Sequence, residues 1–293
     1  MSEAVAWTVG VTGVTGKTGR LVAEKALGRG WRVRSLTRNR PPVGEWAPLD
    51  WDEPGGWSDA LSGCDAVYVI IPFNHPGAAE RTPDLLAAAA RAGAARIVLL
   101  SSLDAADAAA DDPLVVTETA LTRLDVAWAI LRPTWFLENF TVGSFASMVD
   151  SGDLRLPAGE GLIPFIAIAD IADVAVEALA EDGPTGILPL TGPERLTHAQ
   201  VCEALGRARG ERITFTDASP AEFIALMETR GFSHDYSAFL IKALGDVSSG
   251  ALEIPVTDTV ALVTSRPATS IDTFARESVA GVGDDQASES AGP

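Results

Sequence analysis

Four glycines at intervals of three residues constrain the fold of this chain more than any other feature of its sequence. They are Gly10, Gly13, Gly16 and Gly19. An apolar run, Val5–Thr12, leads into these glycines, and an amphipathic pattern typical of a helix follows over Lys17–Arg29. A glycine-rich turn between a strand and a helix binds the pyrophosphate of a dinucleotide, because backbone N–H groups and the helix N-terminus face the anion. The sequence therefore predicts a dinucleotide site near its beginning.

The pattern Gly-x-x-Gly-x-x-Gly fits this stretch from Gly10 or from Gly13. A start at Gly10 shortens the strand. A start at Gly13 keeps the strand whole and places Gly19 in the first helical turn, where the missing side chain lets helix and strand pack closely. We therefore predict that the cofactor-binding residues of the loop are Gly13, Thr15, Gly16, Lys17, Thr18 and Gly19. A nucleotide-triphosphate P-loop is excluded because its first glycine would fall on Val11.

Short apolar runs alternate with helical patterns through the first half of the chain. The expected strands are Val5–Thr12, Arg32–Thr37, Ala66–Ile71, Arg96–Leu100 and Ala127–Leu131, and the expected helices are Lys17–Arg29, Trp57–Leu61, Pro83–Ala92 and Pro113–Leu124. Near-continuous apolar strands between helices predict an α/β fold with a Rossmann-type, doubly wound parallel sheet over residues 1–133. A smaller C-terminal α+β substrate lobe is expected over 134–280, partly returning to the main sheet, with a disordered polar tail over 281–293.

Helix-start signals recur in the second half. Asp170 is the expected N-cap of a helix that reaches Glu181. Capping boxes are predicted at Thr197 with Gln200 and at Ser219 with Glu222.

The end of the second expected strand indicates which dinucleotide binds. NAD-binding domains place an acidic residue there, about 20 residues after the glycines, to accept hydrogen bonds from the ribose. This chain has no acidic residue between Glu24 and Glu45, and it carries Arg38 and Arg40 instead. Guanidinium groups suit a 2′-phosphate, so we predict NADP(H) as cofactor. Asp50 lies near the end of a further strand region that follows Arg32–Thr37, and it is expected on the adenine side of the cofactor.

Composition narrows the class of function. The chain has 293 residues and a formal net charge of −18, which argues against nucleic-acid or anionic-membrane binding. Its two cysteines, Cys64 and Cys202, form no metal-binding or disulfide pattern, so buried thiols and no metal site are expected. We see no signal peptide or membrane-spanning run and expect a cytoplasmic protein, and the scarcity of lysine against arginine suggests a GC-rich bacterial source.

Several stretches resemble one protein family. They include the glycine loop, Leu36-Thr-Arg38, the segment ending in Ser101-Ser102, and Ile130-Leu-Arg-Pro-Thr-Trp-Phe-Leu-Glu-Asn-Phe140. Over Val5–Glu277 the chain is similar to NmrA-like atypical short-chain dehydrogenases/reductases, and its C-terminal part to the festuclavine-dehydrogenase-like branch. The resemblance implies an NADP(H) domain with a small C-terminal lobe, in a family that contains reductases of quinones, imines or conjugated systems and redox-sensing regulators.

The catalytic pair usual in this superfamily, Tyr-x-x-x-Lys, is absent: neither Tyr68 nor Tyr236 has lysine four positions on. Without that acid, an acceptor that is already electrophilic is favoured. Ligands in such sheets lie beyond the carboxyl ends of the strands. The expected cofactor contacts there are Ile71, Pro72, Ser101 and Pro133. The candidate catalytic residues are His75, Ser101, Ser102, Glu118 and Tyr236, although His75 can also be a plain loop histidine and Glu118 a solvated helix carboxylate.

The lobe is rich in aromatic residues, which suggests an apolar or planar substrate. The expected substrate contacts are Phe73, Trp135, Phe136, Asn139, Phe232 and Tyr236. We therefore predict an NADPH-dependent reductase of an activated small molecule (quinone, imine or enone), acting as a monomer or homodimer. The alternative is a non-catalytic NADP(H)-binding redox sensor or transcriptional co-regulator.

Overall fold

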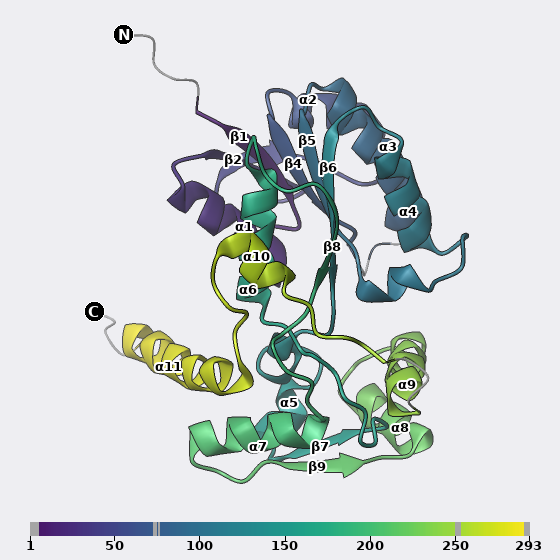
Figure 1. The fold of residues 1–293 in the computed structure, drawn as a ribbon, viewed down its shortest axis with the longest axis vertical. Helices are drawn as coiled ribbons and strands as arrows, with labels where there is room; N and C mark the ends of the chain where they lie inside the picture. Colours follow the sequence, from purple (N-terminus) through teal and green to yellow (C-terminus); the bar gives the residue numbers. More distant parts are fainter. Residues whose placement is uncertain (1–5, 73–74, 76, 250–252, 290–293) are drawn as a thin grey trace. The chain divides into compact units, whose positions relative to one another are not determined.

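Seven parallel strands form the main sheet of the protein in a computed structural model that describes residues 6–72, 75, 77–249 and 253–289, the stretch 281–289 for its backbone only. The strands, in sheet order, are β3 (Glu45–Pro48), β2 (Arg32–Thr37), β1 (Thr8–Thr12), β4 (Ala66–Ile70), β5 (Arg96–Leu100), β6 (Ala127–Pro133) and β8 (Gly186–Leu190) (Figure 1). All residues of β5 are buried, as expected for a strand covered on both faces. The predicted Rossmann-type fold is confirmed.

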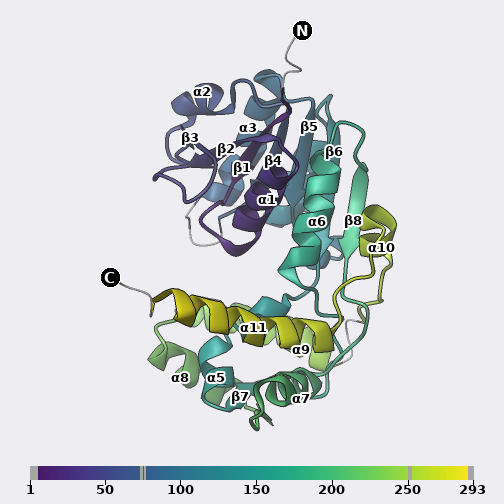
Figure 2. The same ribbon diagram turned by 90° about the vertical axis from the view of Figure 1, so that its left-hand side faces the viewer.

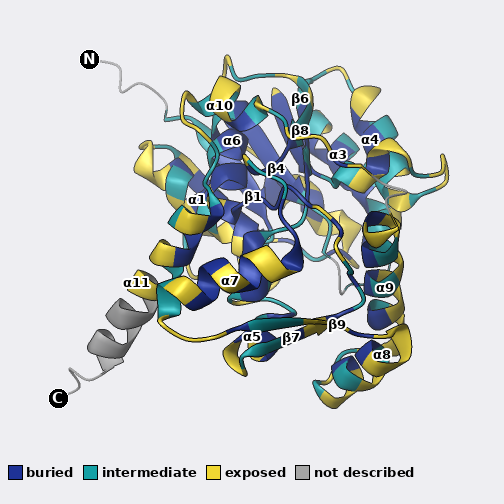
Figure 3. Cartoon of the chain, turned by 60° about the horizontal axis from the view of Figure 1, so that its bottom comes forward, coloured by how far each residue is buried: buried dark blue, intermediate teal, exposed yellow. Residues whose placement is uncertain are grey.

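Helices cover both faces of this sheet. On one face lie α1 (Lys17–Gly28) and α6 (Ile168–Leu179), which pack against each other and on the central strands (Figure 2). The other face carries α2 (Trp57–Leu61), α3 (Ala78–Arg91) and α4 (Pro113–Thr122), which pack in sequence along the sheet. In Figure 3 the central strands are buried, and the helices alternate buried and exposed turns, the pattern of amphipathic helices on a core.

Some predicted boundaries of the first half differ from the structure. Helix α3 begins at Ala78 rather than at Pro83, because Ala78 and Thr82 are buried and extend the packed face toward the N-terminus. Helix α6 begins at Ile168, so Asp170 lies in its first turn and is not its N-cap. Strand β6 continues to Pro133, which pairs with Leu190 of β8.

The described chain divides into two compact units. The first comprises Met1–Thr134, Ile168–Leu190 and Asp258–Pro267, so that α6, β8 and α10 (Thr259–Thr264) belong to the unit of the main sheet. The second comprises Trp135–Ala167, Thr191–Thr257 and Ala268–Pro293.

The second unit is built around a two-stranded parallel sheet, β7 (Asp153–Leu156) with β9 (Thr214–Asp217). Its helical segments are η3 (Leu137–Phe140), α5 (Ala146–Asp150), α7 (His198–Arg209), α8 (Pro220–Thr229), α9 (His234–Ser248) and α11 (Ile271–Glu289). The predicted capping boxes at Thr197 with Gln200 and at Ser219 with Glu222 are confirmed.

Helix α11 also covers residues 281–289, where a disordered tail was expected. Residues 271–289 contain no proline that would end the helix, so it continues past Gly281 and Gly283 although glycine is a poor helix former.

Proline marks both outer strands of the main sheet. Pro48 is the last residue of β3, and Pro189 lies within β8. Proline has no N–H to give to a neighbouring strand, and it is therefore confined to sheet edges. Helix α10 packs beside β8 at one of these edges.

Candidate functional site

The glycine loop follows β1 and leads directly into α1. Gly10 lies inside the strand, whereas Gly13 has a φ of +66°, a left-handed conformation that favours glycine. A Cβ on Gly13 would lie 2.3 Å from Cγ2 of Ile70, and one on Gly19 would lie 2.3 Å from the carbonyl oxygen of Gly13. The turn is therefore at Gly13, and Gly19 is where the helix approaches the strand most closely.

The start of α1 is suited to an anion. Its N-cap residue, Gly16, makes no side-chain capping bond, and the first helical turn has no acidic residue. Thr15, Gly16 and Lys17 are exposed, while Thr18 is buried. A bare helix N-terminus behind an exposed glycine loop offers backbone N–H groups and a partial positive charge to a phosphate. The loop thus fits the pyrophosphate of a dinucleotide.

Two cations stand at the carboxyl end of β2. Arg38 and Arg40 are exposed, and among the described residues neither guanidinium has a hydrogen-bond or ion-pair partner. Next to them is Trp46, which sequence reasoning did not identify. It is 45% exposed, and its Nε1 donates to the carbonyl oxygen of Thr37 at 3.0 Å. This edge of the sheet therefore presents positive charge and an aromatic ring.

Asp50, Asp52 and His75 come together beyond the ends of β3 and β4. One ring nitrogen of His75 and one carboxylate oxygen of each aspartate lie within 4.8 Å of one another, close enough to bind a metal ion together. Nε2 of His75 lies 3.2 Å from a carboxylate oxygen of Asp52, whose other oxygen lies 3.1 Å from Nη1 of Arg81. The Asp50 carboxylate accepts the backbone N–H of Asp52 at 3.0 Å. His75 is therefore paired with a residue that follows β3, the strand that β2, β1 and β4 separate from β5 in the sheet order.

Glu118 of α4 is the centre of a buried polar cluster in the first unit. It is 5% exposed, and Arg132 of β6 contacts both of its carboxylate oxygens. The hydroxyl of Ser101, directly after β5, donates to Oε1 of Glu118 at 2.5 Å. The bonds to Glu118 raise the pKa of the Arg132 guanidinium. The interpretation of Glu118 as a solvated helix carboxylate is thus wrong, because its charge is buried and paired.

The other strand-end candidates have simpler surroundings. Ser102 is the N-cap of a short 3-10 helix (Leu103–Ala106), where its hydroxyl accepts the N–H of Asp104. Ile71 and Pro72 are half-buried after β4, and Pro133 is buried at the end of β6. Phe73, expected to contact substrate, lies outside the described residues.

The predicted substrate contacts of the second unit fall into two groups. Phe232 and Tyr236 stack with their ring centroids 5.4 Å apart, and the Tyr236 hydroxyl lies 2.5 Å from Oγ of Ser144, a residue that sequence reasoning did not single out. Trp135 and Phe136 are half-buried on the segment that leads into η3, and Asn139 is half-buried within η3. This segment is held by backbone bonds to Ile166 on both sides of Phe136.

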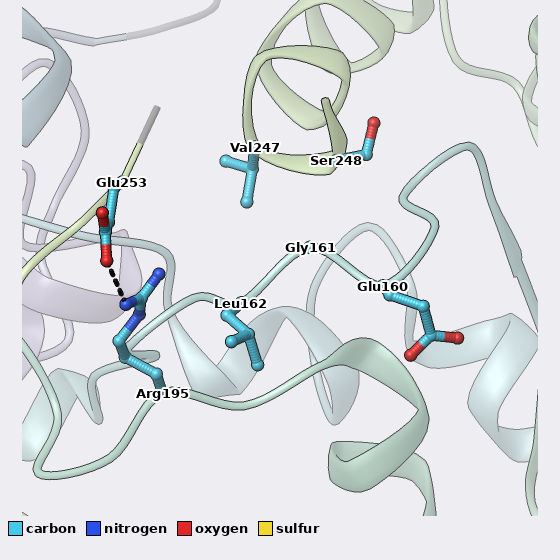
Figure 4. Close-up of a pocket in the computed structure, with 7 residues that line it drawn as sticks. All are labelled: Glu160, Gly161, Leu162, Arg195, Val247, Ser248 and Glu253. Carbon is cyan, nitrogen blue, oxygen red and sulfur yellow. Dashed lines mark hydrogen bonds and ion pairs between the residues drawn. The ribbon is translucent and has the colours of Figure 1, made fainter. Parts of the chain in front are cut away.

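A separate hollow in the second unit is shown in Figure 4. It is lined by Glu160, Gly161, Leu162, Arg195, Val247, Ser248 and Glu253. Nη1 of Arg195 donates to Glu253 at 2.7 Å, and Glu160 adds a second carboxylate. Because the single guanidinium is already paired, this hollow offers no net positive charge to the phosphates of a dinucleotide.

Taken together, the parallel sheet, the glycine turn at Gly13 and the uncapped start of α1 define a dinucleotide-binding protein of the Rossmann type. Comparisons with known proteins narrow this class. The profile of the NAD(P)H-binding family matches residues 13–182. The chain is 32% identical over 269 residues to an uncharacterized oxidoreductase, YesF, of Bacillus subtilis, covering 90% of this chain and 93% of that one. It is 30% identical over 290 residues to an NAD(P)H azoreductase of Xenophilus azovorans, covering 94% and 98%.

Solved structures share the fold. The NADPH complex of the quinone oxidoreductase QOR2 of Escherichia coli aligns with a TM-score of 0.79 and 22% identity, over 92% of this chain and 99% of that one. The transcriptional regulator NmrA in complex with NADP aligns with a TM-score of 0.74 and 18% identity, over 94% and 95%. The chain belongs to the NAD(P)H-binding family, and its relatives of at least 30% identity are named as oxidoreductases, among them a festuclavine dehydrogenase of Aspergillus fumigatus. Among the described residues, no helix is both long and apolar enough to span a membrane.

Proposed function

We propose that this protein is an NADPH-dependent reductase that delivers hydride to an activated apolar or aromatic small molecule, such as a quinone, an azo compound, an imine or an enone. When bound, the nicotinamide supplies the hydride. The residues of the chain hold and orient the cofactor and exclude water. Three observations support this function: the positive charge of Arg38 and Arg40 at the end of β2, the hydrogen bonds that engage the candidate acids, and the aromatic residues of the second unit.

The preference for NADPH rests on Arg38 and Arg40. Both guanidinium groups are exposed and unpaired within the described part of the chain, so each can bind a 2′-phosphate without giving up another partner. A charge-assisted hydrogen bond from arginine is about twice as strong as a neutral one. The overall charge of −18 repels an anionic cofactor, so the attraction for its phosphates must come from local positive charge, such as that of Arg38 and Arg40. The pyrophosphate would be held by Gly13, Thr15, Gly16, Lys17, Thr18 and Gly19, and the adenine would lie toward Asp50.

The proposed reaction rests on one observation: the Glu118 carboxylate is buried and paired with Arg132. This residue lies on the helix where the superfamily has its tyrosine and lysine. Its carboxylate is occupied by Arg132 and by the Ser101 hydroxyl, so neither Glu118 nor Ser101 offers a proton to a developing oxyanion. His75 is placed among acidic residues toward the β3 edge. With Glu118 and Ser101 engaged in this way, an acceptor that takes hydride readily and then receives its proton from solvent is favoured.

The aromatic residues of the second unit support an apolar, planar substrate. The stacked rings of Phe232 and Tyr236 offer a flat face, and Trp135 and Phe136 are half-buried rings on a segment fixed by backbone bonds. Aromatic side chains with one polar end bind flat conjugated molecules well, since they stack and orient at the same time. The azoreductase relative and the quinone oxidoreductase of the same fold are consistent with this substrate class.

The experiment is a turnover assay with purified protein and NADPH. A panel of quinones, azo dyes, cyclic imines and enones is added, and the absorbance of the reduced nicotinamide is followed against an enzyme-free reaction. We expect consumption of NADPH with at least one electrophilic class and none with simple ketones. Turnover of simple ketones but not of activated acceptors would contradict the proposed mechanism.

A second function, a non-catalytic NADP(H)-binding regulator, is compatible with the shared fold of NmrA. Such a protein would bind NADP(H) without hydride transfer to any member of the panel. Cofactor binding with no turnover across all four classes would favour this alternative over the reductase.

A further inference from the structure

Ser101, Glu118 and Arg132 connect three neighbouring elements of the first unit. Ser101 follows β5, Arg132 lies near the end of the adjacent strand β6, and Glu118 projects from α4, which packs on β6. The side chains of Glu118 and Arg132 are 7% and 15% exposed. Arg132 contacts both oxygens of Glu118, and its Nε donates to Oε1 at 3.0 Å. Such a two-pronged pair fixes both the charge and the orientation of the carboxylate.

The pair determines what the Ser101 hydroxyl can do. A serine hydroxyl has one hydrogen to donate and two lone pairs to accept with. That hydrogen is directed at Oε1 of Glu118 over 2.5 Å, and an ionised carboxylate accepts hydrogen bonds and donates none. Toward any ligand, Ser101 therefore presents lone pairs alone. It can accept an N–H or O–H, but it cannot donate to a carbonyl oxygen.

The location of Ser101 indicates which ligand group it meets. The guanidinium groups of Arg38 and Arg40, unpaired among the described residues, lie at the carboxyl end of β2, and the glycine loop follows the adjacent strand, β1. A dinucleotide whose 2′-phosphate is at β2 and whose pyrophosphate is at the loop extends past β4 toward β5 and β6, because ligands in such sheets lie along the carboxyl ends of the strands. Its nicotinamide carries a carboxamide with two N–H donors, the complement of a hydroxyl that only accepts.

We propose that Glu118 and Arg132 are positioning residues that lock Ser101 as a hydrogen-bond acceptor for the carboxamide N–H of the nicotinamide. The inference rests on the NADP(H) binding of the proposed function, and it adds a fixed orientation of the nicotinamide ring.

The test compares three probes by equilibrium binding, with no turnover required. NADP⁺ has the carboxamide, its 3-acetylpyridine analogue has a methyl ketone without N–H, and 2′,5′-ADP lacks the nicotinamide half. We expect the wild type to bind NADP⁺ about fivefold more tightly than the acetylpyridine analogue, the value of one neutral hydrogen bond. Ser101→Ala should abolish this discrimination and leave the affinity for 2′,5′-ADP unchanged, whereas Ser101→Thr should retain it.

Matched variants separate orientation from folding. Ser102→Ala changes the neighbouring serine, whose hydroxyl serves Asp104, and should keep the wild-type discrimination. Glu118→Ala removes the acceptor that fixes the Ser101 hydrogen, so discrimination should fall while binding of 2′,5′-ADP persists. A wild type that binds both nicotinamide probes equally, or a Ser101→Ala variant that still prefers NADP⁺, overturns the proposal. Equal weakening of all three probes by Ser101→Ala would also overturn it, since that result shows a merely structural role.

The proposed reductase activity can fail independently of this inference. A protein that turns over no acceptor but loses its preference for NADP⁺ on Ser101→Ala retains the oriented nicotinamide and loses only the reductase assignment.

Discussion

The guanidinium of Arg132, on β6, contacts both carboxylate oxygens of Glu118, on α4, and both side chains are largely removed from solvent. Burying two charges is unfavourable unless they meet in good geometry, and breaking such a pair leaves one charge without compensation. The relationship therefore has consequences for stability that are separate from cofactor binding.

Arg132→Ala should lower the free energy of unfolding by about 3 kcal/mol, because it leaves the Glu118 carboxylate buried and unpaired. Removing both partners in Arg132→Ala/Glu118→Ala should be less harmful than the sum of the two single changes. Urea unfolding of the four proteins in a double-mutant cycle measures this coupling. Strictly additive effects would show that the two charges do not stabilise each other.

Arg38→Ala should weaken NADPH binding about tenfold or more, since a charge-assisted bond to the 2′-phosphate is lost, and should leave NADH binding nearly unchanged. Parallel titrations of both cofactors measure the selectivity. The control is Arg32→Ala, an exposed arginine at the opposite end of the same strand, β2. The same loss of NADPH affinity in both variants would point to general charge and not to a phosphate site.

Gly19→Ala should disrupt both folding and cofactor binding, because its Cβ would lie 2.3 Å from the Gly13 oxygen and 2.7 Å from the Thr12 oxygen, both backbone atoms. Forced contacts of this kind cost about 1–3 kcal/mol. Gly28→Ala, at the other end of α1, has nothing within 4 Å of the added carbon and should stabilise the helix by up to about 1 kcal/mol. Thermal unfolding and NADPH titration of the two variants measure the contrast, and a Gly19→Ala protein with wild-type affinity would contradict the close approach.

His198 should make the protein sensitive to acid. It is 1% exposed within the aromatic side chains of Phe140, Phe165 and Phe215, and neither ring nitrogen has a partner among the described residues. Burial lowers the pKa of His198 from 6.5 to about 3. Between these values the unfolded chain binds a proton that the folded chain does not. Stability from this group is thus complete above about pH 6.5 and falls as the pH decreases, by about 2 kcal/mol at pH 5.

The measurement is the free energy of unfolding at pH 7 and pH 5 for the wild type and for His198→Leu. The variant should lose less stability between the two pH values, by about the 2 kcal/mol assigned to this histidine. His234→Gln, at an exposed histidine, is the matched control and should follow the wild type. An unchanged pH dependence in His198→Leu would show that the histidine is protonated in the folded protein.

Local patterns predicted much of the fold. Strands β2 and β5 and helix α2 have the predicted bounds. For β5 the reason is a continuous apolar run, which is typical of a strand covered on both faces. The edge strands β3 and β8 were not named, since Glu45–Pro48 and Gly186–Leu190 are short and contain proline, which weakens a strand signal. Helix α3 was predicted to begin at Pro83, because proline is favoured in the first turn of a helix. It begins at Ala78 instead, because Ala78 packs in the core.

The candidate site was less predictable. The glycine register followed from sequence, because only a turn at Gly13 completes the strand before it. The state of Glu118 did not follow, since its partner Arg132 is 14 positions away on a neighbouring strand and side-chain pairing across elements leaves no periodic signal. Trp46 and Ser144 were missed for the same reason: each gains its contact only through folding.

The prolines at the two borders of the main sheet set a limit on self-association. A second copy that added its own strand to β3 or β8 would meet a backbone with a missing donor at Pro48 or Pro189. Pairing of two copies through either border strand would lack a backbone hydrogen bond at that proline, which disfavours growth of the sheet from molecule to molecule.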